Sequence, residues 1–523
     1  MKATPQDTEF RISSQSQSTQ DADFNKMESD NKDTNGLVAS TLMRCSLVSA
    51  LVGAVHFGWM MGEMGYLPFN NVKFCAMPRI PAGQCILFPG HSNAEWTMQS
   101  TAWAVGGGIG ALLSAFPADT FGRQRTLGWN GLLMIAGGFV QMFAGDIYTF
   151  AIGRGINGLA SGIAINVLNN YLREISPVQW RMFYVTMVQL ALSTGALIVT
   201  SLMYAISKLP NEWEYKYLFG GPILLGVLQL AFMGFIIESP AWLIQTHQVE
   251  RSLEVMNQLY QPGDVESHWK AQVESISRQN QEVQSSSKLG LLLSPKYSKQ
   301  FSIAVVLAMM QQLCGMNALV VYGPQLFQAI GVRELRLSNT LVNFSRLDNM
   351  FLAARYGDRF SRRTLLLVGS MGMAFGALGF VLCQVYPNDT SKWFSIVCMV
   401  VFVGSFCFSI GSLGWLVSTE LVPETLGATS GAIATLFTWT AQFFIGVYFQ
   451  QISNVAHWGD QAFAIFAVVN LLFFFFVYAF VPDTRNKTSD QVTAMFCPSS
   501  ESSKDNAFVF WNSDNENCIL SSP

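Results

Sequence analysis

The stretch Asp119-Thr-Phe-Gly-Arg-Gln-Arg-Thr-Leu127 is nearly repeated in the second half of the chain as Asp358-Arg-Phe-Ser-Arg-Arg-Thr-Leu365. Both copies follow long apolar runs. A looser pair keeps a similar offset, since Glu238-Ser-Pro240 is matched by Pro482-Asp-Thr484. A chain that repeats its loop signals at one spacing contains two copies of one unit. Loops of this kind between membrane-length apolar runs predict a transporter with two pseudo-symmetric halves around a central site.

The composition indicates a membrane protein. Hydrophobic residues make up 50% of the 523 residues and charged residues 12%, whereas soluble domains carry about 25% charged residues. A membrane helix needs about 20 apolar residues. Such runs are predicted six times before a polar interval and six times after it, at 42–66, 98–118, 126–145, 148–171, 182–206, 217–237, 299–328, 337–357, 364–386, 393–419, 427–450 and 461–481.

The predicted fold is an all-α membrane protein with twelve transmembrane helices in two pseudo-symmetric six-helix bundles. Basic residues gather in short loops on one side, which with an even number of spans places both termini in the cytoplasm. The net charge of -3 does not indicate the basic surface that a nucleic-acid-binding protein needs. The expected organisation is a disordered cytoplasmic tail at 1–41, a six-helix bundle at 42–238, a cytoplasmic linker with short helices at 239–298, a second bundle at 299–482 and a cytoplasmic tail at 483–523.

Charged residues at the predicted cytoplasmic helix ends are expected to form the gate. A transporter must close one side of its cavity with bonds that can break again, and ion pairs worth about 1 kcal/mol each suit this purpose. The alternative is that these charges only fix the topology. The predicted gating network contains Asp119, Arg123, Arg154, Glu174, Arg181, Glu238, Asp358, Arg359, Arg362, Arg363 and Glu420.

The cysteines and the remaining polar motifs do not indicate a catalytic site. Cys75 and Cys85 share a predicted external loop and could form a disulfide, and Asn388-Asp-Thr in another external loop could carry a glycan. The cysteines show no CxxC or Cys/His cluster, and no nucleophile–base pair or phosphate-binding glycine loop is evident. We therefore expect no metal, no cofactor and no enzymatic activity.

Several motifs occur in an order that resembles the sugar porter family of the major facilitator superfamily. The resemblance covers about residues 42–490 and implies twelve helices, alternating access and transport of hexoses, pentoses or polyols. The motifs are Asp119-x-x-Gly-Arg-x-Arg125, Gly153-Arg154, Glu174-Ile-Ser-Pro177, Glu238-Ser-Pro240, Gln311-Gln312-x-x-Gly315-x-Asn317 and Pro482-Asp-Thr-Arg-Asn-Lys-Thr488.

The resemblance also implies sugar contacts. Amides donate and accept hydrogen bonds without charge, which suits hydroxyl groups, and the tryptophan of this pattern stacks on the sugar. The implied residues are Gln189, Gln311, Gln312, Asn317 and Trp415. Gln311 and Gln312 point about 100° apart on a helix, so both reach one ligand only in a wide cavity or where the helix unwinds. The alternative is that these amides hold neighbouring helices together.

The sequence departs from the family pattern at several positions. Thr438 stands where an amide is expected, with Gln442 one turn later, and both are included among the substrate contacts. Ser361 replaces a glycine in the second loop copy, and Gly427 stands in place of an arginine. These losses predict a thinner cytoplasmic charge network in the second half.

The predicted helix at 337–357 departs furthest. Asn343, Arg346 and Asn349 are three residues apart and share one helix face, while Asp348 points elsewhere. An arginine in mid-membrane costs roughly 2.5–3.5 kcal/mol, so this face should line the cavity or contact a neighbouring helix. An arginine near the site would favour a more acidic or more heavily hydrogen-bonded substrate than glucose.

The first helix bears on coupling. Met60 stands where proton-coupled members of the family carry an aspartate, so facilitated diffusion is expected, although His56 and Glu63 flank Met60 on the same face and could titrate. The prediction is a plasma-membrane sugar uniporter, most simply for a hexose, acting as a monomer in the lipid bilayer. Two alternatives remain: a proton-coupled symporter of a sugar, polyol or sugar acid, and a nutrient-sensing receptor with a transporter fold.

Overall fold

A computed structural model describes residues 39–496, except for 64–87, 178–180, 206–211, 262–264, 285–286, 320–334, 387–388, 456–458, 486 and 488. These residues are nearly all helical, and the only strand-like pairing among them is an isolated bridge between Ala39 and Tyr260. The predicted disulfide pair Cys75 and Cys85, the predicted glycan site Asn388 and most of both tails lie outside the described residues.

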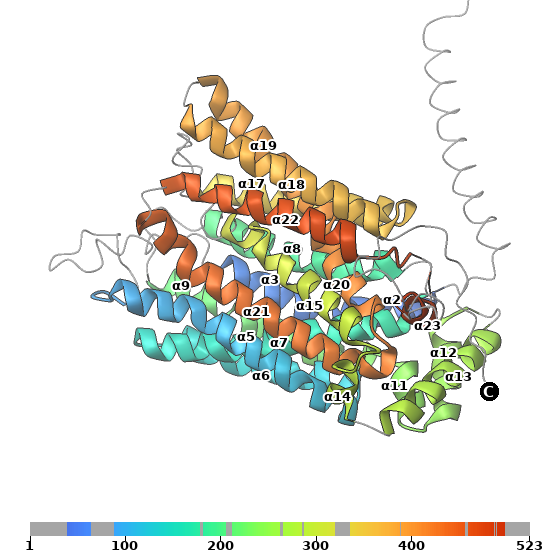
Figure 1. Ribbon diagram of the computed structural model, residues 1–523. Helices are drawn as coiled ribbons and strands as arrows, with labels where there is room; N and C mark the ends of the chain where they lie inside the picture. The colour runs from blue at the N-terminus through green and yellow to red at the C-terminus, as the bar shows by residue number, and fades with distance from the viewer. Residues whose placement is uncertain are drawn as a thin grey trace, which may run out of the picture.

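The long helices overlap the predicted apolar runs in both halves (Figure 1). The first half contains α2 (Thr41–Ala50), α3 (Val52–Gly62), α5 (Asn93–Phe121), α6 (Arg123–Met142), α7 (Ile147–Ile175), α8 (Arg181–Ala205), α9 (Glu212–Phe219), α10 (Gly221–Phe232) and η3 (Met233–Phe235). The polar interval contains the short helices α11 (Pro240–Gln245), α12 (Val249–Leu259), α13 (Val265–Gln284) and α14 (Lys288–Leu292). The second half contains α15 (Ser298–Leu313), α17 (Leu335–Tyr356), η4 (Gly357–Arg359), α18 (Arg362–Val385), α19 (Asp389–Phe408), α20 (Ile410–Glu420), α21 (Glu424–Val455), η5 (Gly459–Phe463), α22 (Ala464–Phe480) and α23 (Ser489–Ala494).

The described helices form an all-α membrane fold. Nine helical segments in the described part of the chain are long and apolar enough to cross a bilayer. Helices α6, α7 and α17 run alongside them and carry more polar residues (Figure 1). Large apolar side chains such as Phe116, Leu224, Phe375 and Trp393 are exposed. An apolar outer surface with buried polar groups is what a bilayer requires.

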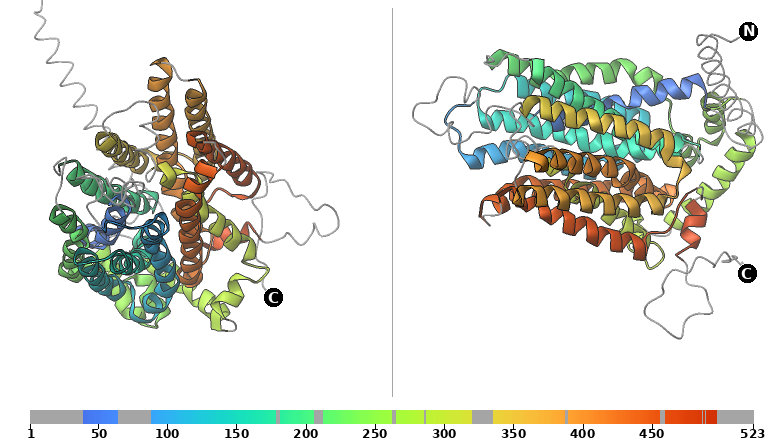
Figure 2. Two further views of the ribbon diagram at one scale, coloured as in Figure 1. Left: turned by 90° about the vertical axis from the view of Figure 1, so that its left-hand side faces the viewer. Right: turned by 90° about the horizontal axis from the view of Figure 1, so that it is seen from above.

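The short helices α11, α12 and α13 gather at one end of the long helices (Figures 1 and 2). The backbone N–H of Ser40 donates to the carbonyl oxygen of Leu259 at 2.8 Å, and the Tyr260 hydroxyl donates to the carbonyl oxygen of Ile175 at 2.6 Å. The linker is therefore bonded both to the start of α2 and to the end of α7. This end is the one predicted to be cytoplasmic.

Viewed along the helices, the blue-to-green helices lie on one side and the yellow-to-red helices on the other (Figure 2). Between these groups α5 packs against α21 and α8 against α17. Within the first group α5 and α7 nearly touch, since a Cβ on Gly106 would lie 2.0 Å from the carbonyl oxygen of Gly155. Small residues permit such close helix crossings in membranes.

Candidate functional site

A central cavity lies where helices of both halves converge. Its volume is about 30 Å³, which holds about two water molecules but no sugar ring. Helices on one side must therefore separate before a sugar can enter. The lining residues are Phe57 and Met61 from α3, Ile165 from α7, Gln189 and Leu192 from α8, Gln311 and Gln312 from α15, Met316 and Asn317 after it, Arg346 from α17, Phe406 from α19, Trp415 from α20, and Thr438, Trp439 and Gln442 from α21.

Three predicted amides line this cavity, two from the end of helix α15 and one from beyond a break in that helix. Helix α15 ends at Leu313, Gly315 takes a φ of +100°, and helical structure resumes at Met316. A Cβ on Gly315 would lie 2.4 Å from the ring of Phe466, so glycine is required by both conformation and space. Gln311 and Gln312 both precede this break and line the cavity from adjacent positions of helix α15, so the unwinding accounts only for the placement of Asn317. Gln311, Gln312 and Asn317 all line the cavity, and the Asn317 amide donates to the side-chain oxygen of Gln312.

Gln311 also bonds to a second helix break. Helices α19 and α20 are separated at Ser409, whose φ of -119° and ψ of -111° are not helical. The Gln311 amide nitrogen donates to the carbonyl oxygens of Ile410 at 3.2 Å and Gly411 at 3.0 Å. Its nitrogen therefore supports the start of α20. The next turn of this helix places Trp415 in the wall of the cavity.

Three aromatic side chains of the cavity, Phe57, Phe406 and Trp439, were not predicted as contacts from the sequence. Trp439 and Phe57 form a cluster with Trp103, with ring centroids 4.8–5.3 Å apart. A Cβ on Gly107 would lie 2.4 Å from the Trp439 ring, so α21 packs tightly on α5 at this point. The available signals were the position of Trp439 next to Thr438 and the position of Phe57 beside a glycine of α3.

Helix α17 places one of its three predicted polar residues in the cavity wall. Arg346 lines the cavity and is 2% exposed. Asn343 and Asn349 are not among the described residues that line the cavity. Asn343 is buried elsewhere, and the Asn349 amide donates to the carbonyl oxygen of Ser345 at 2.8 Å. Asp348 is exposed. Of the three polar residues predicted to share a face of this helix, only the central one, Arg346, lines the cavity.

A chain of buried polar side chains crosses the first half. Glu63 pairs with Arg154 and accepts a hydrogen bond from Gln141 Nε2 at 2.6 Å. Gln141 in turn accepts from Asn157 Nδ2 at 3.0 Å, and Asn157 Oδ1 lies 3.3 Å from His56 Nε2. This chain connects His56 and Glu63, the two residues predicted as titratable. Their partners come from α6 and α7, which sequence patterns could not specify.

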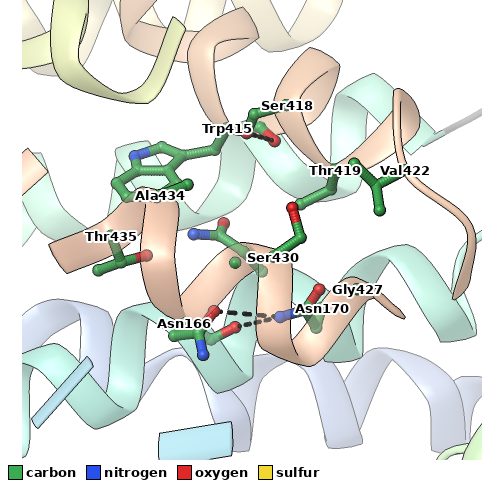
Figure 3. Close-up of a pocket in the computed structure, with 12 residues that line it drawn as sticks. Asn166, Asn170, Trp415, Ser418, Thr419, Val422, Gly427, Ser430, Ala434 and Thr435 are labelled. Atoms are coloured by element: carbon green, nitrogen blue, oxygen red, sulfur yellow. Dashed lines mark hydrogen bonds between the residues drawn. The ribbon is translucent and has the colours of Figure 1, made fainter. Parts of the chain in front are cut away.

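A second polar cavity lies between α7 and α20–α21, with Trp415 in its wall as well (Figure 3). The Asn170 amide donates to the backbone oxygen of Asn166 at 3.0 Å and to its side-chain oxygen at 3.2 Å. A Cβ on Gly431 would lie 2.4 Å from the side-chain oxygen of Asn166. The two halves therefore meet closely between the central cavity and the linker end.

A direct bond between the halves is made by Arg173, which the sequence did not single out. Its Nη2 donates to the carbonyl oxygen of Val422 at 3.0 Å. Gly427 lies beside this bond, because a Cβ there would be 3.5 Å from Nη1 of Arg173 and 3.3 Å from the Asn170 side-chain oxygen. The arginine of the family pattern would thus start its side chain in contact with Arg173 and Asn170.

The first loop copy forms a tight charge cluster. Arg123 donates two hydrogen bonds to Glu174, Nε to Oε2 at 3.0 Å and Nη2 to Oε1 at 2.7 Å. Asp119 lies 3.7 Å from the same guanidinium and 2.5 Å from Nζ of Lys288 in the linker. Glu238 accepts from the backbone N–H of Arg123 at 2.8 Å. Burial raises the pKa of the Glu238 carboxyl, while the backbone donors of Ser239 and Arg123 oppose that rise.

The second loop copy makes different bonds. Glu420 accepts a hydrogen bond from the Thr484 hydroxyl at 2.5 Å, and Asp483 accepts from the backbone N–H of Arg362 at 3.1 Å. Arg363 donates to the carbonyl oxygen of Tyr478 at 2.6 Å. The Arg359 guanidinium lies over the Tyr356 ring, 5.2 Å from its centroid, and the Arg359 carbonyl accepts from Arg485 at 3.1 Å.

Arg154 lies away from the cytoplasmic cluster in which the sequence placed it. Twenty residues of α7 separate Arg154 from Glu174, roughly 30 Å along a helix. Its partner is Glu63, and its Nε donates to the carbonyl oxygen of Gln99 at 3.1 Å. The side chains of Arg181 and Asp358, also predicted for the gate, lie outside the described residues.

Comparisons with known proteins agree with this architecture. The family model described as "Sugar (and other) transporter" matches residues 18–496. The chain is 30% identical to solute carrier family 2, facilitated glucose transporter member 3, of Bos taurus, over 86% of this chain and 91% of that protein. It is 27% identical to the arabinose-proton symporter of Bacillus subtilis, over 75% of this chain and 84% of that protein. Its fold matches the structure of the proton:xylose symporter XylE bound to 6-bromo-6-deoxy-D-glucose, with a TM-score of 0.76 at 21% identity over 88% of this chain and 100% of that one.

Proposed function

The chain belongs to the sugar (and other) transporter family, and we propose that it carries a hexose such as glucose across a membrane by facilitated diffusion. The observation that carries this proposal is the convergence of amides from both halves on one central cavity. Gln189 comes from α8, and Gln311, Gln312 and Asn317 come from the second half. Amides of this kind bond sugar hydroxyls without a charge to desolvate.

The proposed cycle uses the two cavities in turn. The sugar enters the central cavity from outside and binds the amides, with Trp415 against its ring, while Thr438 and Gln442 complete the wall from α21. Release toward the cytoplasm then requires α7 to separate from α20 and α21, which opens the second cavity and breaks the Arg173 bond to Val422. We place this monomeric transporter in the plasma membrane, with both termini in the cytoplasm.

The test is uptake of labelled hexose into liposomes that contain the purified protein, without a pH gradient. Gln312→Ala should abolish saturable uptake while the protein inserts normally, because the variant loses an amide of the cavity wall. Gln384→Ala on α18 removes a glutamine that does not line the cavity, and it should transport like the unmodified chain. Normal transport by Gln312→Ala would show that the site is assigned wrongly.

A proton-coupled symporter is the second candidate, and one observation favours it. Glu63 is 0% exposed and is held by Arg154 and Gln141. Its second oxygen has no hydrogen-bond partner among the described residues, and neither has Nδ1 of His56. A buried carboxyl beside an arginine can gain or lose a proton as its surroundings change.

An imposed pH gradient separates the two candidates. Facilitated diffusion predicts the same initial rate with and without the gradient. Symport predicts uptake that is driven by an inward proton gradient and is lost when an ionophore dissipates it. If symport holds, Glu63→Gln should remove the response to the gradient and retain exchange of sugar, since a glutamine keeps the hydrogen bonds but carries no proton.

A further inference from the structure

Arg346 occupies an unusual place in the central cavity. It lies near the middle of the 22-residue helix α17, roughly 16 Å from either end. Its side chain is 2% exposed and shares the cavity wall with Gln311, Asn317 and Trp415. A guanidinium is charged at every accessible pH, so this residue places a permanent positive charge inside the transport site.

The described protein groups leave most of this guanidinium unbonded. Its Nε and Nη1 are buried and have no hydrogen-bond partner among the described residues. None of the ion pairs between described residues includes it, and Asp348, two residues away, is exposed. Arg154, the comparable buried arginine of the first half, has Glu63 and the Gln99 carbonyl as partners. A buried charge without a partner is expensive, and an anionic group that enters the cavity would offset that cost.

We propose that Arg346 binds the carboxylate of the substrate, and that the preferred substrate is a hexuronic acid, a hexose whose sixth carbon is a carboxylate. This inference rests on the proposed function, because it assigns a substrate class to the same cavity. The planar guanidinium donates two parallel hydrogen bonds to a carboxylate. The amides of α15 and α8 then bind the ring hydroxyls, and Trp415 and Trp439 provide apolar surface for the ring face.

Two features of the cavity favour a sugar acid over a simple anion. Five amide side chains line the same cavity as Arg346, namely Gln189, Gln311, Gln312, Asn317 and Gln442, and a small anion offers them no hydroxyl groups to bind. Aromatic surface from Trp415 and Trp439 also faces the cavity. A neutral hexose, in contrast, would meet the amides and the aromatic surface but leave the charge of Arg346 uncompensated.

The experiment compares uptake of labelled D-glucuronate and D-glucose, which differ only at the sixth carbon, into liposomes that contain the full chain. Acetate serves as a competing carboxylate without a ring. We expect kcat/KM for glucuronate to exceed that for glucose about 10-fold or more, and Arg346→Gln to lower this ratio about 10- to 100-fold, as expected for hydrogen bonds to a charged group. Arg346→Lys should give an intermediate ratio, because it keeps the charge but loses the paired donors.

Arg355→Gln is the matched control, since Arg355 lies on the same helix with its guanidinium 5.7 Å from the Tyr356 ring centroid and outside the cavity. It should leave the ratio unchanged. A binding measurement covers variants that transport poorly: glucuronate should raise the melting temperature of the unmodified protein but not of Arg346→Met. The same variant should melt higher than the unmodified protein without ligand, because an apolar side chain replaces an unpaired buried charge.

The outcomes are distinct. Saturable glucose uptake with no glucuronate uptake overturns the role of Arg346 and leaves sugar transport intact. An unchanged ratio in Arg346→Gln overturns it as well. Inhibition by acetate as strong as by glucuronate shows a general anion site and contradicts the sugar-acid assignment. Saturable uptake of neither sugar overturns the proposed function itself.

Discussion

The two copies of the repeated loop each cap the N-terminus of the helix that follows, but they do so with different hydrogen bonds. In the first copy Gly122 joins α5 directly to α6 with a φ of +94°. Its neighbour Glu238 accepts hydrogen bonds from the N–H groups of Arg123 and Gln124. A Cβ on Gly122 would lie 2.1 Å from Oε2 of Glu238. The cap of α6 is therefore supplied by a distant carboxylate, and glycine is required to admit it.

In the second copy the cap comes from the loop itself. Ser361 has a φ of -65° and a ψ of 140°, and its hydroxyl accepts from the N–H of Thr364 at 3.3 Å. Asp483 then needs to reach only the N–H of Arg362. The serine that departs from the family pattern is thus a regular N-cap, and its backbone does not require glycine. One sequence pattern can serve two local structures.

The largest expected effect comes from breaking the ion pair of the first copy. Glu174→Gln removes the closer of the two carboxylates that pair with Arg123, whose side chain is 2% exposed, and breaking a buried pair costs about 3–5 kcal/mol. Glu420→Gln is the matched variant in the second half. It should cost about 1 kcal/mol, because an amide oxygen still accepts the Thr484 hydrogen bond. Equilibrium unfolding in mixed micelles measures the free energy of unfolding of both variants. Equal losses of stability would contradict the proposed difference between the two loop copies.

The next effect tests the two caps. Gly122→Ala forces a side chain into the left-handed region and displaces the Glu238 carboxylate, which together cost about 2–3 kcal/mol. Ser361→Ala loses one side-chain cap, worth about 1 kcal/mol, and Ser361→Gly should cost only a few tenths of that. The melting temperatures of the three variants should fall in this order. A tolerated Gly122→Ala would show that the first cap does not depend on glycine.

A smaller effect is expected where the halves meet. Arg173→Gln weakens the bond to Val422 and should favour the inward-open state by about 1–2 kcal/mol. Ser430→Cys in a cysteine-free background reports this opening, because Ser430 lines the cavity of Figure 3. Its modification by a cytoplasmic maleimide should become faster in Arg173→Gln. Labelling at an unchanged rate would mean that this bond does not hold the closed state.

The smallest effect concerns the linker. Lys288 pairs with Asp119, but the two side chains are 35% and 25% exposed, and such pairs contribute about 0–1 kcal/mol. Lys288→Ala should therefore shift the melting temperature slightly, and high salt should remove the difference between variant and unmodified protein. A loss as large as that of Glu174→Gln would place Lys288 within the buried cluster instead.

Much of the central site was predictable from residue order. Gln189, Gln311, Gln312, Asn317, Arg346, Trp415, Thr438 and Gln442 were predicted as contacts, and all line the cavity. Asn343 and Asn349 do not line it. Helical spacing predicts that they share a face with Arg346, but it does not predict how much of that face is open to the cavity. Phe57, Phe406 and Trp439 were missed because an aromatic residue in an apolar run carries no sign of which neighbour it meets.

The gate was less predictable. Arg154 was grouped with the cytoplasmic charges, yet it pairs with Glu63 far along α7. The Arg123–Glu174 pair joins two helices of the same half, while a direct bond between the halves in the described part of the chain runs from Arg173 to a backbone oxygen. A backbone acceptor has no sequence signature, so no motif could reveal it.

The sequence by itself determined the helix pattern, the two related halves and the chemistry of the site, because apolar run length, turn residues and amide side chains are local properties of the chain. The tertiary structure decided which charges pair, where α15 unwinds and which residue of α17 enters the cavity. Those outcomes depend on the close approach of helices distant in sequence, such as α5 to α21 and α8 to α17. Partner choice in a low-dielectric interior is set by that approach and not by local pattern.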